Sequence, residues 1–215
     1  MPGEEYDAGP FLPAGGGRSL TALRRAAADC RGCPLHADAT QTVFGRGSAG
    51  ARVMLIGEQP GDQEDRRGEP FVGPAGGVLR KALDEAGLDP DQAYVTNAVK
   101  HFKFKLGGSG GKRRLHQPPT LREAAACRPW LEAELRLVAP ELLVALGATA
   151  GRALLGSGFR VTRDRGRLLE AEGRPLIATI HPSAVLRADR DAREAAREGL
   201  VADLELAART LAGDA

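Results

Sequence analysis

The chain has 215 residues, which is enough for one well-buried domain and too few for two comfortable ones. Hydrophobic residues make up 42% and charged residues 27%, as in an ordinary globular protein, and no stretch approaches the ~18 to 20 apolar residues that cross a bilayer. The acidic start, with Glu4, Glu5 and Asp7, is unlike a secretory signal. We therefore expect a cytoplasmic, monomeric protein without membrane contact.

Two regions are expected along the chain. Residues 1–17 are rich in Gly and Pro and lack periodicity, which predicts a disordered tail, and residues 18–213 are expected to form one domain. Capping residues and apolar spacing predict short helices over 19–29 and up to about 156, and further helices over 75–86, 120–138 and 192–211. Short apolar runs predict strands over 52–56, 94–99, 141–146 and 176–180.

This alternation of strands and helices predicts the α/β class, with a three-layer αβα sandwich around a four-stranded, mainly parallel sheet. In such sheets, ligands bind beyond the carboxyl ends of the strands. Glu58 follows the first strand, Asn97 lies near the end of the second, and His181 follows the last. These three side chains are therefore expected to converge at one edge of the sheet.

Each of these side chains has a chemical use and a plainer alternative. A carboxylate such as Glu58 on a rigid turn can act as a base or stabilise positive charge on a sugar, although a loop glutamate is usually only solvated. Asn97 offers a donor and an acceptor that suit a pyrimidine edge, or it caps a turn. His181 can be catalytic or structural. Phe71 can stack on a flat ligand or fix its loop to the core.

Basic residues are concentrated in one stretch of a nearly neutral chain. The net charge is +2, yet no Asp or Glu lies between Gln92 and Glu123. Four of the five lysines fall there, followed by two arginines: Lys100, Lys103, Lys105, Lys112, Arg113 and Arg114. Such a segment is typical of phosphate contact or of a solvated loop. The interleaved Phe102 and Phe104 favour nucleic acid, because aromatic faces stack on bases.

Three cysteines, an odd number, argue against a disulfide framework. Cys30 and Cys33 form a C-x-x-C pair, and Cys127 is distant in sequence. A metal site built on them needs a fourth ligand, and His101 is the candidate. A Cys3His set suits zinc and is unusual for an iron–sulfur cluster, so spacing alone leaves the metal open.

Four segments together resemble the uracil-DNA glycosylase superfamily, most closely its iron–sulfur (family 4) branch. They are Gly-Glu-Gln-Pro-Gly at 57–61, Pro-Phe-Val-Gly-Pro-Ala-Gly at 70–76, Thr-Asn at 96–97 and His-Pro-Ser at 181–183. The resemblance implies that uracil is flipped out of DNA into the cleft. It implies further that Phe71 stacks on the base, that Asn97 reads its edge beside Gln59, that His181 stabilises the departing anion, and that Glu58 faces the sugar.

The resemblance also implies a 4Fe–4S cluster with a structural role, with structural zinc as the alternative. The cluster cysteines of that branch align with Cys30, Cys33 and Cys127, while His101 stands where a fourth cysteine is usual.

Two departures from family 4 resemble the UdgX branch, whose members become covalently joined to DNA after excising uracil. They are Gln59 and a lengthened loop over 107–117 that contains Lys112-Arg113-Arg114-Leu115-His116. In that branch the histidine of this loop forms the bond, which here is His116. Lys112, Arg113 and Arg114 are expected to hold phosphates, and the segment from Ser183 to Arg187 is expected to contact or enter the DNA.

The predicted function is therefore excision of uracil from DNA, from single strands at least as well as from duplex, followed by covalent capture of C1′ by His116. One alternative is an ordinary glycosylase that turns over and leaves an abasic site. A second is a non-catalytic module that binds DNA or senses redox state through its metal site.

Overall fold

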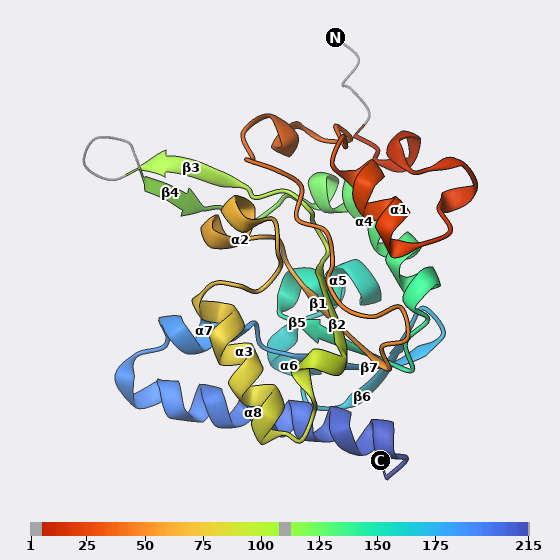
Figure 1. The fold of residues 1–215 in the computed structure, drawn as a ribbon. Helices are drawn as coiled ribbons and strands as arrows, with labels where there is room; N and C mark the ends of the chain where they lie inside the picture. The colour runs from red at the N-terminus through yellow and green to blue at the C-terminus, as the bar shows by residue number, and fades with distance from the viewer. Residues whose placement is uncertain (1–5, 108–112, 215) are drawn as a thin grey trace.

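The computed structural model describes residues 6–107 and 113–214. A central five-stranded sheet lies between two layers of helices (Figure 1), which confirms the predicted three-layer α/β class. Its strand order is β2-β1-β5-β7-β6, and the strands are β1 (Val53–Gly57), β2 (Ala93–Asn97), β5 (Leu142–Leu146), β6 (Leu168–Ala171) and β7 (Arg174–Thr179). The first four strands of that order are mutually parallel, and β6 runs antiparallel to β7 at the edge.

The sheet has five strands where four were expected, and the additional one is the edge strand β6. Its residues 168–171 are half exposed and include a charged side chain, so they lack the apolar run that marks the central strands. Glu172 and Gly173 join β6 to β7, both with left-handed φ, of 53° and 68°. Two such residues in succession form the tight turn that suits a hairpin.

Three of the described helices, each of six residues or fewer, were not predicted from the sequence. Their bounds are α1 (Leu20–Ala27), α2 (Asp62–Arg67), α3 (Pro74–Glu85), α4 (Leu121–Val138), α5 (Ala148–Leu155), α6 (Val161–Asp164), α7 (Pro182–Arg187) and α8 (Arg190–Ala212). Single 3-10 turns are η1 (Gly9–Phe11), η2 (Ala14–Gly16), η3 (Pro34–Ala37) and η4 (Pro90–Gln92). The expected caps are present at Ser19 of α1 and in the Thr120–Glu123 capping box of α4, whereas α2 lies inside a segment expected to be a loop. No helix in the described ranges has the length and apolar character to cross a membrane.

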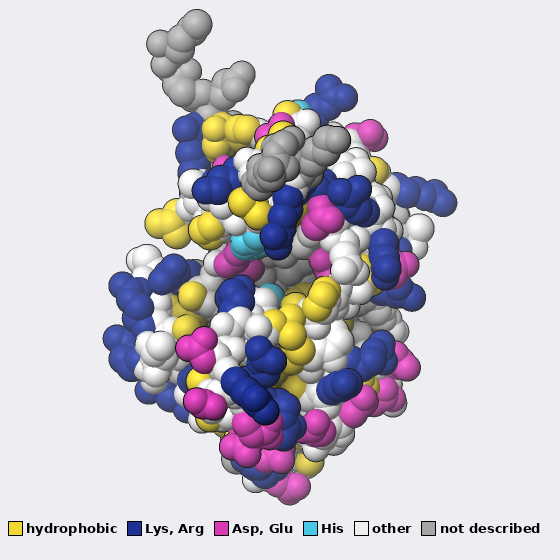
Figure 2. Space-filling model, turned by 90° about the vertical axis from the view of Figure 1, so that its left-hand side faces the viewer, with side chains coloured by type: hydrophobic (Ala, Val, Ile, Leu, Met, Phe, Trp, Pro, Cys, Tyr) yellow, Lys and Arg dark blue, Asp and Glu magenta, His cyan; other side chains and the backbone are white. Residues whose placement is uncertain are grey.

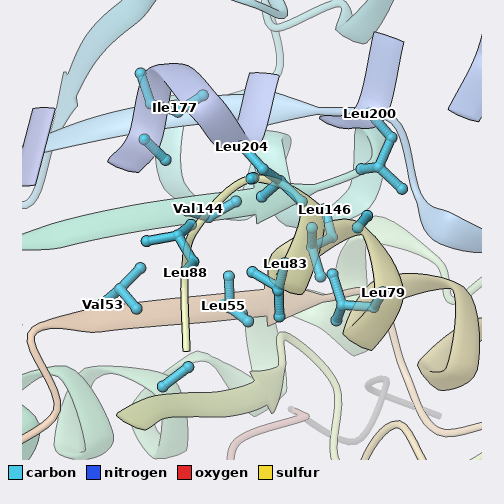
Figure 3. Close-up of a cluster of buried hydrophobic side chains, with 14 of the residues drawn as sticks. Val53, Leu55, Leu79, Leu83, Leu88, Val144, Leu146, Ile177, Leu200 and Leu204 are labelled. Atoms are coloured by element: carbon cyan, nitrogen blue, oxygen red, sulfur yellow. The ribbon is translucent and has the colours of Figure 1, made fainter. Parts of the chain in front are cut away.

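Alternate residues of each central strand pack into different hydrophobic clusters. Val53, Leu55 and Val144 face α3, α7 and α8, in the cluster drawn in Figure 3. Met54 and Leu143 face the opposite layer, which includes α4 and α5. Burial on both faces explains why these strands read as continuous apolar runs in the sequence.

The described part of the N-terminal segment departs from the predicted disorder. Residues 6–17 contain η1 and η2, and Ala8 is buried. The Ala8 N–H donates to the carbonyl of Ala126 in α4 at 2.9 Å, so this segment packs on the domain. A Cβ on Gly32 would lie 2.6 Å from the Ala8 backbone, which explains glycine at that position. Residues 1–5, the rest of the predicted tail, lie outside the described residues.

A two-stranded hairpin projects from the body of the molecule beyond β2 (Figure 1). It pairs β3 (Phe104–Gly107) with β4 (Arg113–His116) in antiparallel register, which sets Phe104 opposite His116. The sequence predicts a loop here instead, because glycines and cations dominate this stretch. The hairpin carries His116 at the end of β4 that lies nearest the central sheet.

Candidate active-site cleft

A cleft of about 500 Å³ opens at the carboxyl edge of the central sheet. Eight of the predicted site residues line it, which are Glu58, Gln59, Phe71, Asn97, His116, His181, Ser183 and Arg187. Figure 2 shows histidine and acidic side chains bordering a hollow in the surface, with Lys and Arg side chains nearby. The fold therefore brings together residues that lie up to 129 positions apart, from Glu58 to Arg187, at the carboxyl ends of the strands, where ligands are expected to bind.

Asn97 ends β2 and supplies the deepest polar group of the cleft. Its side chain is 2% exposed, and its Oδ1 has no hydrogen-bond partner in the described structure. A buried acceptor without a partner is costly unless a ligand completes it. Gly57 leaves the space that this amide occupies, because a Cβ at Gly57 would lie 2.3 Å from Asn97 Oδ1 and 2.6 Å from Phe71 Cζ.

Phe71 forms an aromatic wall of the cleft from an unusual backbone conformation. Its φ is +54°, in the left-handed region that non-glycine residues seldom adopt. Gly76, in the first turn of α3, makes this possible, since a Cβ there would lie 1.7 Å from the Phe71 carbonyl oxygen. The ring of Phe71 lies 6.0 Å from that of His181, tilted by 31°.

His181 precedes α7 and caps it with its own ring. Ser183 N–H donates to Nδ1 at 3.1 Å, and the Ser183 hydroxyl lies 2.7 Å from the same nitrogen. Arg187 donates to that hydroxyl oxygen at 2.9 Å, which directs the hydroxyl proton towards Nδ1. Burial, with the nearby Arg187 and His116, lowers the pKa of His181 to about 4. The ring is therefore neutral near pH 7, with its proton on Nε2 as a donor.

Glu58 and His116 meet at the mouth of the cleft, with His116 Nε2 3.4 Å from Glu58 Oε1. The Thr149 hydroxyl, at the start of α5, donates to the other carboxylate oxygen and fixes its direction. Burial lowers the pKa of His116, Glu58 opposes that shift, and Arg187 adds to it. A neutral imidazole beside a fixed carboxylate is equipped for nucleophilic or general-base chemistry.

Arg114, predicted to bind DNA phosphate, instead joins the hairpin to α2. Its guanidinium forms ion pairs with Asp62 and Asp65, the latter at 2.6 Å, and only 11% of its side chain is exposed. It also lies over the rings of Phe102 and Phe104, at 5.3 and 5.0 Å from their centroids. These two carboxylates neutralise the Arg114 charge. Because both belong to α2, the ion pairs attach the hairpin to that helix.

The aromatic residues of the basic stretch are likewise engaged within the protein. Phe102 is buried and stacks on Phe104 at 5.1 Å, and the Phe102 ring lies 6.1 Å from that of His116. The predicted stacking of these rings on DNA bases is therefore replaced by support of the hairpin that carries His116.

Gln59 lines the cleft, but its side-chain amide is engaged with the base of the hairpin. Nε2 donates to the carbonyls of Lys103 and Gln117 at 3.2 and 3.0 Å, and Oε1 accepts from the Lys103 N–H at 3.2 Å. These bonds connect the two chain segments that enter and leave the hairpin. The amide predicted to read uracil is thus bonded to the main chain on both sides of the hairpin.

Of the three described lysines in the basic stretch, two are engaged with carboxylates of the protein. Lys100 is fully buried against Glu134, and Lys103 donates to Glu123 at 2.8 Å. Lys105 and Arg113 are exposed on the hairpin strands, and Arg187 is exposed beside the cleft. Lys112, also predicted to contact DNA, lies outside the described residues.

The three cysteines share one buried hydrophobic cluster and are all free thiols. Trp130 Nε1 donates to Cys30 Sγ at 3.2 Å, and Lys100 N–H donates to Cys127 Sγ at 3.3 Å. Burial raises the pKa of Cys33, and it raises the pKa of Cys127 to about 12. N–H donors to sulfur and a water-poor shell suit thiolates that ligate iron, because positive metal charge offsets this resistance to ionisation.

His101 is buried and follows Lys100, whose N–H bonds Cys127 Sγ, but its own Nε2 lies 2.9 Å from the Thr42 hydroxyl. Among the described residues, no three Cys, His, Asp or Glu side chains are arranged to hold a metal ion. Burial first, and then the nearby His36, lowers the pKa of His101 to about 4. A neutral ring with one nitrogen engaged leaves Nδ1 as the atom that could bind metal.

Some residues of the site were missed from the sequence. Thr149 follows β5 just as Glu58 follows β1, so the strand-end rule could have found it. Asp62 and Asp65 carry no such signal, because their role depends on a cation 49 or more positions away.

Comparison with known proteins agrees with this geometry. A sequence model of the uracil DNA glycosylase superfamily matches residues 44–205, which contain the whole cleft. The chain therefore belongs to the uracil DNA glycosylase superfamily, which confirms the resemblance seen in its sequence.

Several curated relatives are similar to this chain over most of its length. A type-4 uracil-DNA glycosylase of Thermotoga maritima is 37% identical over 160 residues, which cover 74% of this chain and 78% of that protein. A type-4 uracil-DNA glycosylase of Archaeoglobus fulgidus is 33% identical over 176 residues, or 78% of this chain and 83% of that protein. A type-5 uracil-DNA glycosylase of Thermus thermophilus is 34% identical over 151 residues, with 66% and 68% covered.

Proposed function

We propose that this protein excises uracil from DNA and then captures the abasic site covalently through His116. The observation that carries the first half is the buried, unpartnered Oδ1 of Asn97, which lines the cleft together with Phe71. Uracil presents an N3–H donor beside the O4 acceptor, so one amide orientation satisfies both. Cytosine presents an acceptor at N3 and a donor at C4, which would leave the buried amide mismatched. The type-4 names of the relatives support the same substrate.

The first chemical step breaks the bond between uracil N1 and C1′ of the deoxyribose. Its electron pair leaves on the base, so uracil departs as an anion and C1′ becomes an oxocarbenium centre. His181 offers Nε2–H to the base oxygen on which charge develops, since its Nδ1 is engaged with Ser183. Glu58, held by Thr149, stabilises the cationic sugar. Uptake of a proton from solvent completes neutral uracil.

The second step gives C1′ a new bond to His116 Nε2. The lowered pKa of His116 favours its neutral form, and in the tautomer that carries its one proton on Nδ1 the Nε2 atom has a lone pair, 3.4 Å from the Glu58 Oε1 that stabilises the cationic sugar. The lone pair attacks C1′, and the alkylated ring then loses its Nδ1 proton to solvent. A held imidazole competes with water through its high effective concentration. The protein is thereby consumed, one molecule per lesion.

The test is a denaturing gel of the protein with a labelled, uracil-containing oligonucleotide, beside the His116→Ala variant. We expect a heat-stable, slow-moving band with the unchanged protein and none with the variant. Release of uracil without any band, with alkali cleaving the strand, identifies an ordinary hydrolytic glycosylase. An intact strand identifies a non-catalytic module that binds DNA or senses redox state. That last alternative gives no purpose to Asn97 and His181 in one cleft.

The proposal includes single-stranded DNA as a substrate at least as good as duplex, because no base pair has to open. Ser183, Arg187 and Arg113 are the proposed DNA contacts, and the protein is proposed to act as a cytoplasmic monomer. Excision much faster from duplex than from the matching single strand would contradict the strand preference.

We also propose a 4Fe–4S cluster held by Cys30, Cys33 and Cys127, with His101 Nδ1 as fourth ligand and zinc as the alternative metal. Three free buried thiols, two of which accept N–H hydrogen bonds, support it. The group would join α4 and the segments around residues 30 and 100, which are far apart in sequence, and its role here is structural.

A further inference from the structure

Lys100 and Glu134 form a buried ion pair directly behind Asn97, which lines the cleft. The Lys100 Nζ lies 2.5 Å from Glu134 Oε2, and the two side chains are 1% and 0% exposed. Removing two charges from water costs free energy that their attraction returns only in part, and apolar side chains of similar volume often stabilise a core equally well. The pair therefore calls for a role other than stability, and the mechanism above does not use it.

The other bonds of Lys100 lead to the residue proposed to read uracil. Its Nζ donates to the Asn97 carbonyl oxygen at 2.7 Å and to the Thr96 hydroxyl at 2.7 Å. Both acceptors belong to the last two residues of β2. A charged donor makes a shorter and stronger bond to a carbonyl than a neutral donor does. The Lys100 ammonium group thus fixes the main-chain carbonyl of Asn97 through a charged hydrogen bond.

Lys100 is itself immobilised at every polar group. Its N–H donates to Cys127 Sγ at 3.3 Å, and its carbonyl accepts from the Val43 N–H at 2.8 Å. Glu134, its partner, also accepts from the Tyr94 hydroxyl at 2.9 Å and the Gly45 N–H at 3.0 Å. Neither charge can shift without breaking several buried bonds.

The side chain of Asn97 shows why this support matters. Its Oδ1 makes no hydrogen bond in the described structure, so the protein directs the amide through its backbone and through close contact with Gly57. We propose that Lys100, held by Glu134, is a positioning residue that fixes Asn97 in the orientation that accepts uracil and rejects cytosine. This inference rests on the proposed function and concerns the same base-binding site.

The test removes both charges while keeping their volumes, in the double variant Lys100→Met/Glu134→Gln. A glutamine at 134 keeps an acceptor for the Tyr94 hydroxyl, and no unpaired charge is left in the core. Calorimetric titration with free uracil is expected to show affinity about tenfold weaker than in the unchanged protein, the scale of one misplaced hydrogen bond. Affinity for an undamaged single strand is expected to stay unchanged, because the surface contacts remain.

A second variant, Lys100→Gln/Glu134→Gln, keeps an uncharged donor at position 100 and is expected to recover part of the uracil affinity. The matched control is Arg165→Met/Asp203→Asn, which removes another partly buried ion pair, with a 2.7 Å contact, from the α8 side of the sheet. That control is expected to bind uracil normally. If the folded Lys100→Met/Glu134→Gln variant binds uracil as tightly as the unchanged protein, the positioning role is wrong. If the unchanged protein binds no uracil, the proposed function itself fails.

Discussion

The Nε2 atom of His116 lies 3.4 Å from Glu58 Oε1, although the two residues come from different sheets and are separated by 58 positions. Glu58 follows a central strand, and His116 is brought to it by the projecting hairpin. The group proposed to stabilise the cationic sugar and the group proposed to capture it therefore share one edge of the cleft. If uracil release precedes adduct formation, a change at Glu58 should slow both steps together.

Glu58→Gln is expected to slow uracil release by at least about 100-fold, because the neutral amide no longer stabilises the cationic sugar. Adduct formation is expected to slow in parallel, since both outcomes share the first step. Single-turnover assays that quantify uracil and adduct from the same samples measure this. The exposed Glu69→Gln is the matched control, and adduct formation with no uracil release would contradict the sequence of steps.

The pH dependence of excision is expected to reflect His181. Its pKa in the folded protein is about 4, below the ordinary value of about 6.5, because the ring is buried and lies near Arg187. Uracil release should therefore be level from about pH 8 to 5 and fall as the pH drops through about 4. The same depression means that stability falls as the pH decreases from about 6.5 towards 4.

Arg187→Gln provides the control for this profile. The charge of Arg187 lowers the pKa of His181, so its removal is expected to raise that pKa and move the acid limb to higher pH. Circular dichroism at each pH separates loss of fold from loss of activity. An unchanged protein whose activity falls with a midpoint near 6.5 would show that His181 is not held in its neutral form.

Arg114→Ala and Arg113→Ala are expected to have different effects, although the residues are adjacent. Loss of Arg114 removes ion pairs to Asp62 and Asp65 and the support over Phe102, so His116 loses its position. Adduct yield should then fall by more than about tenfold while uracil release continues. Arg113 is exposed, and its loss should weaken DNA binding mainly at low salt. Equal adduct yields in the two variants would contradict the positioning role of Arg114.

Gly76→Ala and Gly77→Ala form another adjacent pair with opposite expectations. A methyl group at Gly76 would collide with the Phe71 carbonyl, so this variant should displace the aromatic wall and lose uracil binding. No atom lies within 4 Å of a Cβ at Gly77, and alanine there should stabilise α3 by about 0.5 to 1 kcal/mol. Thermal unfolding and uracil titration of both variants measure this, and normal uracil binding by Gly76→Ala would contradict the account of Phe71.

The metal proposal predicts iron and acid-labile sulfide in protein purified without oxygen, with visible absorption from thiolate-to-iron charge transfer. His101→Cys is expected to retain iron longer against a chelator, because cysteine thiolate is the usual ligand of such clusters. In the same chelator experiment, the Cys127→Ala variant should lose its iron rapidly. Colourless, zinc-loaded protein would instead establish the alternative metal.

The sequence predicted the central fold because its strands and helices carry local signals. The apolar runs of β1 and β5 and the capping box of α4 identify their elements without knowledge of the rest of the chain. β6 was missed because its half-exposed pattern differs from that of the buried strands. The packing of Ala8 on α4 was missed for a similar reason, since a Gly- and Pro-rich segment shows no periodicity even when it is ordered.

The candidate site was predicted where the chemistry follows a strand end, as at Glu58, Asn97 and His181. Where a side chain's partner is remote in sequence, the structure shows contacts that the sequence could not predict. Arg114 carries the sequence signature of a phosphate ligand, and only the fold reveals the two carboxylates that neutralise it. Gln59 was likewise assigned to the base, whereas its bonds run to the main chain of the hairpin.

The separate attachment of the hairpin has a consequence for how such an activity could arise or be transferred. β3 and β4 pair only with each other among the described strands, while Asn97, Phe71 and His181 depend on the central sheet and its helices. The proposed recognition of the base and the proposed capture of the sugar therefore depend on different structural units. A repair enzyme of this architecture could gain or lose suicide chemistry by exchange of one short appendage, with its substrate choice inherited unchanged.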